Sequence, residues 1–228
     1  MNKKIILIIF IIIIFVVALT LPTSKKNETI KENLLGIDYK KEGNESTLKY
    51  DTTNPVVAMY IEKYGSIVIE LYKDKAPNTV NNFISLVKSG FYDNNSFHRL
   101  VKSFVLQGGD PNGNGSGGPG YSIKGEFTSN GFENNLKHEK WVVSMARSND
   151  KDSAGSQFFI CLDDASNLDG NYASFGKVID GFSILEEIEK NEIISDQTTG
   201  KLRNNLTIKK AIVDLKNNEV EEVIKVEK

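Results

Sequence analysis

The sequence is poor in the residues that bind metals or form cross-links. Cys161 is the only cysteine, and only two histidines occur among 228 residues. One thiol cannot form an intramolecular disulfide, and one thiol with two imidazoles is a weak ligand set for structural zinc. We therefore expect a fold held together by core packing, with no metal site.

An excess of charge of either sign is also missing. The 28 Lys and Arg residues nearly balance the 30 Asp and Glu residues, which gives a formal net charge of −2 at pH 7. Such a chain has no overall basic field to attract a nucleic acid. The remaining composition, with 39% hydrophobic residues, is ordinary for a globular protein. We expect no nucleic-acid partner.

A long apolar run is missing everywhere except at the N-terminus. There it extends from Ile5 to Leu21, after Asn2-Lys3-Lys4, and its length of about 17 residues is at the lower end of what crosses a bilayer. Residues 1–22 are therefore predicted to be a transmembrane signal anchor or a signal peptide. Ala18-Leu19-Thr20 matches a cleavage site poorly, which favours an uncleaved anchor.

The charges on either side of this run bear on its orientation. Lys3 and Lys4 favour a cytoplasmic N-terminus, although Lys25 and Lys26 on the other side weaken the asymmetry. We expect a single-pass protein of the cell membrane whose bulk lies outside the cytoplasm, or a secreted protein if the segment is cleaved.

Two polar segments flank the folded domain that we predict for residues 54–216. Residues 23–53 carry scattered Lys, Glu and Asn with no sustained period, which predicts a polar linker that tethers the domain. Residues 217–228 form a charged C-terminal tail, for which a solvated tail and an added edge strand are both open.

Within residues 54–216, short strand patterns alternate with two helical ones. Val56 to Ile61 and Ser66 to Leu71, joined by a Gly-containing turn, predict a β-hairpin. An apolar stripe with helical spacing lies between Pro77 and Gly90, which suit the two ends of a helix. Further strands are predicted at 141–145, 157–161, 174–178 and 206–215, and a second helix at 182–189. This order indicates a closed or nearly closed β-structure with helical lids.

The most informative stretch runs from Ser96 to Tyr121, SFHRLVKSFVLQGGDPNGNGSGGPGY. A cation, an amide and several aromatics lie there beside a Gly-rich loop, where backbone can approach a ligand closely. Together with Ser144 to Asp163 (SMARSNDKDSAGSQFFICLD) and Asn167 to Val178 (NLDGNYASFGKV), this stretch resembles the cyclophilin family of peptidyl-prolyl isomerases over roughly residues 54–215. The resemblance implies a mainly β fold: an eight-stranded antiparallel closed β-barrel capped by two α-helices.

The resemblance also implies roles for individual residues. Arg99 is the implied catalytic cation, and Gln107 the amide that positions substrate and arginine. The implied substrate-binding residues are Phe104, Val105, Gly115, Ala146, Arg147, Gln157, Phe159, Leu168 and Tyr172. His98 matches a structural neighbour of the arginine and stays outside the mechanism, because bond rotation needs no proton transfer. The implied partners are proline-containing segments of unfolded or exported proteins, bound by a monomer without a cofactor.

This chain departs from the best-known members of the family at three places. Ala146-Arg147-Ser148 stands where they carry Ala-Asn-Ala, and its Ser-Asn-Asp sequel is similar to bacterial forms. Asn167 replaces their tryptophan before the pocket leucine, and Tyr172 replaces their pocket histidine. A tyrosine can still close the pocket, whereas Asn167 cannot supply the indole N–H contact that the family uses for cyclosporin.

Two alternative functions need to be weighed against an isomerase that helps exported proteins fold. Gly113 to Gly118 satisfies the dinucleotide pattern G-x-G-x-x-G, but Pro119-Gly120 follows at once and no βαβ unit surrounds it. A dinucleotide cofactor is therefore not expected. The more serious alternative is a catalytically weak proline-peptide-binding chaperone or scaffold module, tethered to the membrane. Retention of Arg99, Phe104, Gln107 and Phe159 speaks against it.

Overall fold

The computed structural model describes residues 39–42 and 45–226, and the apolar run predicted as an anchor or signal lies outside them. Eight strands form a ring in the order β12-β3-β4-β10-β8-β9-β6-β5, and β5 pairs back onto β12, with every pair antiparallel. The strands are β3 (Val56–Ile61), β4 (Gly65–Leu71), β5 (Asn95–Val101), β6 (Val105–Gly108), β8 (Val142–Met145), β9 (Phe158–Cys161), β10 (Ser174–Asp180) and β12 (Lys201–Asp214). The predicted eight-stranded closed barrel with two helices is confirmed.

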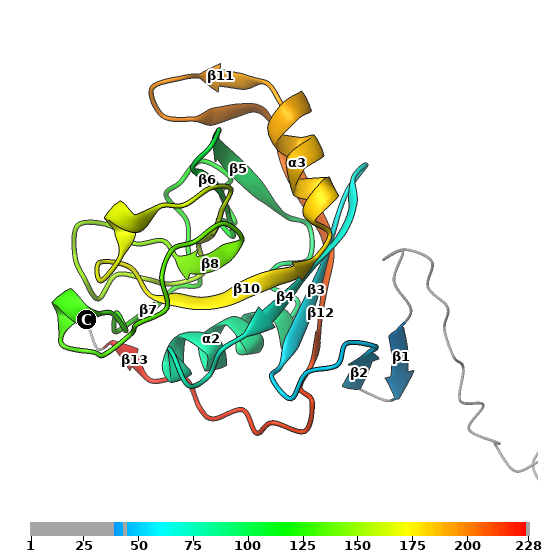
Figure 1. Ribbon diagram of the computed structural model, residues 1–228, viewed down its shortest axis with the longest axis vertical. Coiled ribbons are helices and arrows are strands. Elements are labelled where there is room, and N and C mark those ends of the chain that lie inside the picture. The colour runs from blue at the N-terminus through cyan, green and yellow to red at the C-terminus, as the bar shows by residue number, and fades with distance from the viewer. Residues whose placement is uncertain (1–38, 43–44, 227–228) are drawn as a thin grey trace, which may run out of the picture.

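The two helices lie at opposite ends of the barrel (Figure 1). Helix α2 (Pro77–Lys88) begins at the proline, and Gly90 follows its end with φ 75°. The N-cap residue Ala76 has no side chain that can cap, so the Glu126 carboxylate accepts hydrogen bonds from the backbone N–H groups of Asn78 and Thr79 instead. An anion at this position also suits the positive end of the helix dipole.

Helix α3 (Phe182–Asn191) covers the other end and packs on the core through Leu185 and Ile188. The predicted stripe for this helix also included Phe182, but that side chain is 39% exposed. It lies against Trp141, with ring centroids 5.7 Å apart, on the outside of the barrel. The first turn of α3 therefore contributes less to the core than its spacing indicates.

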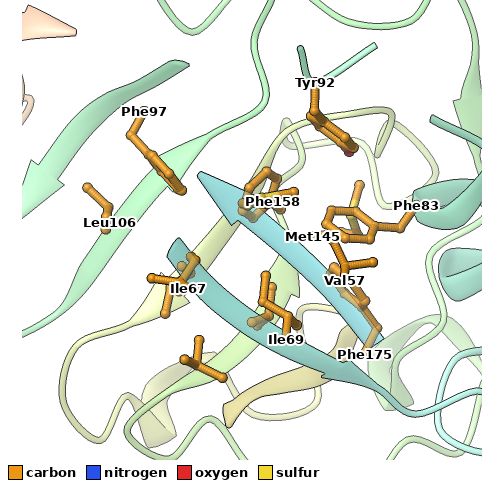
Figure 2. Packing of buried hydrophobic residues seen from close by; sticks show 14 of the residues in the cluster. Val57, Ile67, Ile69, Phe83, Tyr92, Phe97, Leu106, Met145, Phe158 and Phe175 are labelled. Carbon is orange, nitrogen blue, oxygen red and sulfur yellow. The ribbon is translucent and has the colours of Figure 1, made fainter. Parts of the chain in front are cut away.

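The barrel interior is filled mainly by aromatic and branched side chains. Figure 2 shows Phe83 from α2 close to Tyr92, Phe158 and Phe175, with Phe97 on the other side of Phe158. Phe158 makes edge-on contacts with Phe83, Tyr92 and Phe97 at centroid distances of 5.3 to 5.6 Å. All five rings are fully buried. Such close packing makes the barrel a rigid support for whatever lies on its outer face.

The segments on either side of the barrel contain structure of their own. In the stretch predicted as a polar linker, β1 (Tyr39–Glu42) pairs with β2 (Glu45–Leu48). Leu48 is buried on the outer face of the β3–β4 hairpin, and its backbone N–H donates to Asp214. The predicted linker pattern missed this hairpin, because its sequence has no sustained alternation of apolar and polar residues.

After β12 the C-terminal tail runs alongside α2 and then forms a short strand. Strand β13 (Lys225–Val226) pairs with β7 (Ser122–Ile123), so of the two open possibilities the structure has the added strand. The remaining elements are β11 (Ile194–Asp196) and two 3-10 turns, η1 (Thr128–Asn130) and η2 (Ser166–Leu168). Among the residues described, no helix is long and apolar enough to span a bilayer.

Candidate active site

An irregularity in β5 turns the implied catalytic arginine outward. Phe97 pairs with Gly108 and Arg99 with Gln107. Gly108 and Gln107 are adjacent on β6, so His98 on β5 is an extra residue without a partner in the register. Such a bulge shifts the alternation of side chains, and bulges commonly redirect a side chain beside a functional site. Phe97 and Leu100 both point into the barrel core, while the half-buried Arg99 stays outside it.

Outward side chains from β5, from β6 and from the residue before β9 form one polar chain. The Arg99 Nη1 donates to Gln107 Oε1 at 3.2 Å, and Gln107 Nε2 donates to Gln157 Oε1 at 3.0 Å. The Gln157 amide then donates to the carbonyl oxygens of Gly115 and Gly117 at 3.0 and 2.9 Å. On its other side, Arg99 Nε donates to the Thr199 carbonyl oxygen at 2.8 Å. The guanidinium is therefore fixed from two directions.

An apolar cluster adjoins this polar chain, because Phe159 pairs with Gln107 in the β6–β9 register. This cluster, separate from the barrel core, contains buried Val105 and Phe159, with half-buried residues around them. Its members are Val105, Phe159, Cys161 and Ala165, surrounded by Phe104, Ala146, Leu168 and Tyr172. Phe159 meets Tyr172 edge-on at 5.8 Å and stacks on His138 at 6.0 Å. All six apolar residues predicted for substrate binding lie in this cluster.

The Gly-rich loop is folded around the Asp110 carboxylate. It accepts backbone hydrogen bonds from Asn112, Asn114 and Gly115. Burial alone would raise the pKa of Asp110, but these three donors and His98 outweigh it and lower the pKa. Because the carboxylate holds the loop from within, the carbonyl oxygen of Gly115 faces the Gln157 amide. Gly115 has φ 94° there, a conformation that glycine adopts easily because it has no Cβ.

A cavity of about 590 Å³ continues from the polar chain along the loop. Its lining includes Gln107, Gln157, Gly115, Ala146 and Arg147. The Arg147 guanidinium donates to the carbonyl oxygens of Ser148 and Asn171 and lies 4.7 Å from the Tyr172 ring centre. The predicted site residues thus form one continuous surface, in which Arg147 fastens the loop that carries Tyr172.

The titratable groups at the site do not form a proton-transfer system. Burial lowers the pKa of Arg99, with Tyr172 opposing the shift, yet an arginine remains protonated near neutrality. Burial also lowers the pKa of His98 below 6.5, so this imidazole is neutral at pH 7, and its Nδ1 has no hydrogen-bond partner among the described residues. The expectation that His98 does not take part in proton transfer agrees with this environment.

No nucleophile is poised at the site either. Burial raises the pKa of Cys161 to about 12, which leaves the thiol protonated and unreactive. No group of three or more His, Cys, Asp or Glu side chains in residues 39–42 and 45–226 is arranged to hold a metal ion. A fixed cation beside an apolar cluster can bind a ligand and stabilise negative charge that develops in a transition state. Such catalysis needs no covalent bond between enzyme and substrate.

Sequence reasoning missed the contribution of the last barrel strand to this site. The turn between β11 and β12 supplies the Thr199 carbonyl to Arg99, and Asn205 Nδ2 on β12 donates to the carbonyl of Gly113 at 3.0 Å. The predicted strand began only at 206, so these residues had no assigned structure. Asp196-Gln197-Thr198-Thr199-Gly200 does carry the Asp and Gly typical of a tight turn, which could have indicated a hairpin.

Comparisons with known proteins agree with this geometry. The family described as "Cyclophilin type peptidyl-prolyl cis-trans isomerase/CLD" matches residues 56–213. A peptidyl-prolyl cis-trans isomerase of Helicobacter pylori is 44% identical over 132 residues, which are 57% of this chain and 78% of the relative. Isomerase B of Bacillus subtilis is 41% identical over 136 residues, 60% of this chain and 92% of the relative.

Solved structures give the same answer. A cyclophilin type isomerase of Cryptosporidium parvum, in the presence of the dipeptide ala-pro, superposes with a TM-score of 0.61 and 33% identity. The match covers 69% of this chain and 98% of that one. By family match, relatives and fold, this chain belongs to the cyclophilin type peptidyl-prolyl cis-trans isomerases and is an enzyme of that activity.

Proposed function

We propose that this isomerase accelerates the folding of exported proteins, with Arg99 as the catalytic cation and Gln107 as the amide that orients it. The observation that carries the proposal is the Arg99 guanidinium, held by Gln107 on the neighbouring strand beside an apolar cluster. The substrates are proline-containing segments of unfolded chains, bound by a monomer.

The chemistry asks little of the protein beyond such a site. Rotation about an X-Pro amide faces a barrier of about 18 to 20 kcal/mol, because amide resonance is lost in the twisted state. In that state the proline nitrogen becomes pyramidal and richer in electrons. A cation placed beside the nitrogen stabilises the twisted state more than the planar one, which lowers the barrier.

The free donors of Arg99 suit this task. Its Nε and Nη1 donate to Thr199 and Gln107, and no acceptor among the described residues binds Nη2. The Nη2 donors can therefore hold the substrate carbonyl oxygen and approach the proline nitrogen. Because the guanidinium is rigid and planar, fixing two of its nitrogens also fixes the third.

The apolar cluster is the proposed site for the proline ring. Phe104, Leu168 and Tyr172 are half-buried members, which a proline ring would contact first, and they pack on buried Val105 and Phe159. The relative from Cryptosporidium parvum, solved in the presence of ala-pro, supports an X-Pro peptide as the ligand. Residues preceding the proline would run along the adjoining cavity past Gly115, Gln157, Ala146 and Arg147.

Export is inferred from the N-terminal sequence. The apolar run of residues 1–22 would anchor the protein in the cell membrane, with the enzyme domain outside the cytoplasm, or release it if cleaved. Proteins that fold after export also wait for slow X-Pro rotation, which takes tens to hundreds of seconds without a catalyst. A tethered isomerase would act where these chains emerge.

Two measurements test the proposal. Isomerisation of a short prolyl peptide is measured with residues 39–228 and with the Arg99→Ala variant. We expect catalysis from the first and nearly none from the second. If both suppress aggregation of an unfolded protein but neither isomerises the peptide, the domain is instead a peptide-binding chaperone.

The cellular part has its own test. Membrane fractionation with a high-salt wash, external protease and N-terminal sequencing of the mature chain shows where the domain lies. We expect a membrane-bound, protease-accessible protein that retains residues 1–22. A protein found only inside the cytoplasm would exclude the exported-protein role.

A further inference from the structure

We propose that the turn between β11 and β12, residues 196–200, is a positioning element for the catalytic arginine. The inference rests on the proposed role of Arg99. Its central contact is the hydrogen bond from Arg99 Nε to the Thr199 carbonyl oxygen, at 2.8 Å. Residues 196–200 belong neither to the described apolar cluster nor to the lining of the adjoining cavity, so we expect the turn to act on the reaction through the arginine.

Arg99 has two anchors, which lie on opposite sides of β5. On one side, Gln107 on β6 accepts from Nη1 at 3.2 Å, and on the other, Thr199 accepts from Nε. Because a guanidinium is planar, acceptors at two of its nitrogens set both its position and the direction of its remaining donors. With Gln107 alone, the group could still rotate about that single contact.

The Asp196 side chain holds the turn in shape. Its Oδ1 accepts from the Thr198 backbone N–H at 2.9 Å, and its Oδ2 from the Thr199 hydroxyl at 2.8 Å. The Gly200 N–H donates to the Asp196 carbonyl oxygen at 2.8 Å. An Asp that binds backbone two residues ahead is a usual way to fix a tight turn. Here the Gly200 N–H bond holds the peptide unit whose carbonyl faces Arg99, and the two side-chain bonds fix Thr198 and Thr199 just before that unit.

The turn is also fastened to the strand that carries Arg99. The Leu100 N–H donates to the Gly200 carbonyl oxygen at 2.8 Å, and Lys201 pairs with Arg99 in the β12–β5 register. Gly200 has φ 76°, and a Cβ there would lie 2.8 Å from both the Leu100 carbonyl oxygen and Val101 Cγ2. A larger residue must therefore move the turn away from β5, at the residue next to Thr199.

The effect is geometric rather than electrostatic. Asp196 and Thr199 are exposed, and the atom that meets the guanidinium belongs to a neutral peptide group. Replacing the Asp196 carboxylate by an amide should therefore preserve most of its function, because an amide oxygen can still accept from Thr198. Removing the side chain should not.

The first experiment compares four variants of residues 39–228 in a prolyl-peptide assay. We expect Asp196→Ala and Gly200→Ala to lower kcat by about three- to tenfold with KM within about twofold, because a slightly misplaced catalytic group loses rate rather than binding. Asp196→Asn should restore most of the rate. Gln197→Ala, an exposed residue of the same turn with no hydrogen bond described, is the matched control and should match the parent.

The second experiment separates positioning from general loosening. In the Arg99→Lys background the side chain has no Nε–H for Thr199, so Asp196→Ala should cause no further loss of rate. In the parent, the Arg99 Nε–H signal in NMR spectra should be protected from exchange with water, and Asp196→Ala should remove that protection. Thermal unfolding of each variant shows whether the barrel remains folded.

Three outcomes would overturn the inference. They are an unchanged kcat in both Asp196→Ala and Gly200→Ala, an equal loss in the Arg99→Lys background, and an Arg99 Nε–H that is unprotected in the parent. Failure of the proposed function looks different, because Arg99→Ala would then match the parent, whether both isomerise the peptide or neither does. The NMR result does not depend on catalysis and decides the contact in either case.

Discussion

Phe158 and Phe159 are neighbours on β9 and have the same side chain, yet they belong to different regions of the molecule. Phe158 is fully buried inside the barrel among Phe83, Tyr92 and Phe97. Phe159 is only 5% exposed on the outer face, beside Tyr172 and His138. Degree of burial therefore does not separate core from site. The surroundings do, because the cluster of Phe159 includes half-buried residues from outside the barrel strands, such as Leu168 and Tyr172, whereas the rings around Phe158 are all fully buried.

The largest expected effect comes from breaking the inner region. Phe158→Ala should lower the free energy of unfolding by about 3 to 5 kcal/mol, because it leaves a cavity among close-packed rings. Phe159→Ala should cost less stability but should weaken binding of prolyl peptides. Urea denaturation and peptide titration of both variants test the contrast. Equal losses of stability, with peptide binding intact in Phe159→Ala, would show that the outer cluster is a structural core and not a binding site.

The sequence predicted the inner region better than the outer one. Alternation on β3 and β4 and the stripe between Pro77 and Gly90 indicate their burial directly, since each pattern reports one local period. The bulge at His98 breaks that period, so alternation alone could not have placed Arg99 outside the core beside Phe97 inside. The site residues were predicted from the family resemblance, because matching a motif position by position does not require the strand register or its bulge to be known.

Contacts made by the backbone could not be predicted at all. Thr199 acts through its carbonyl oxygen, which every residue possesses, so its type gives no signal. Glu126 caps α2 from 47 or more residues away, and Lys225 pairs with Ile123 across about half the domain. These contacts depend on the closed barrel that brings distant segments together, not on local sequence.

The next effect is the loss of the cation on the outer face. Arg99→Ala should reduce kcat/KM by about 100- to 1,000-fold, roughly 3 to 4 kcal/mol, which is typical for removal of one electrostatic catalytic group. Its stability should change little, because Arg99 is half-buried and outside the barrel core. Arg203→Ala, an exposed arginine on β12, is the matched control. A parallel fall in melting temperature and activity would make Arg99 a structural residue.

A smaller effect is expected at the rim of the outer cluster. Asn167 is exposed on η2 beside Leu168, where the family's best-known members carry tryptophan. Without the indole donor, a cyclosporin carbonyl would stay unpaired, which costs about 1 to 3 kcal/mol, and the lost apolar area of the indole adds to this cost. Together they should lower the affinity by about ten- to several-hundred-fold. We expect an active enzyme that tolerates cyclosporin, and Asn167→Trp should restore some binding. Low-nanomolar binding by the parent, measured calorimetrically, would contradict this prediction.

The smallest expected effect is a dependence of stability on pH that both regions share. Burial lowers the pKa of His98 at the bulge and of His138 beneath Phe159, both below 6.5. The Asp110 and Asp169 carboxylates oppose these shifts but do not cancel them. When the pH falls below about 6.5, the unfolded chain takes up protons that the folded chain does not, so the free energy of unfolding decreases.

The window of this effect is narrow enough to test. Between pH 6.5 and about 5 the histidines dominate, because the pKa values of Asp110 and Asp169 are lowered and both stay ionised there. Each unit of pKa difference is worth about 1.4 kcal/mol, and His98→Leu should make the slope of unfolding free energy against pH shallower in this range. The rate of catalysis should stay flat over the same range, since bond rotation transfers no proton. A kcat that falls with His98 protonation would instead connect the bulge directly to the chemistry of Arg99.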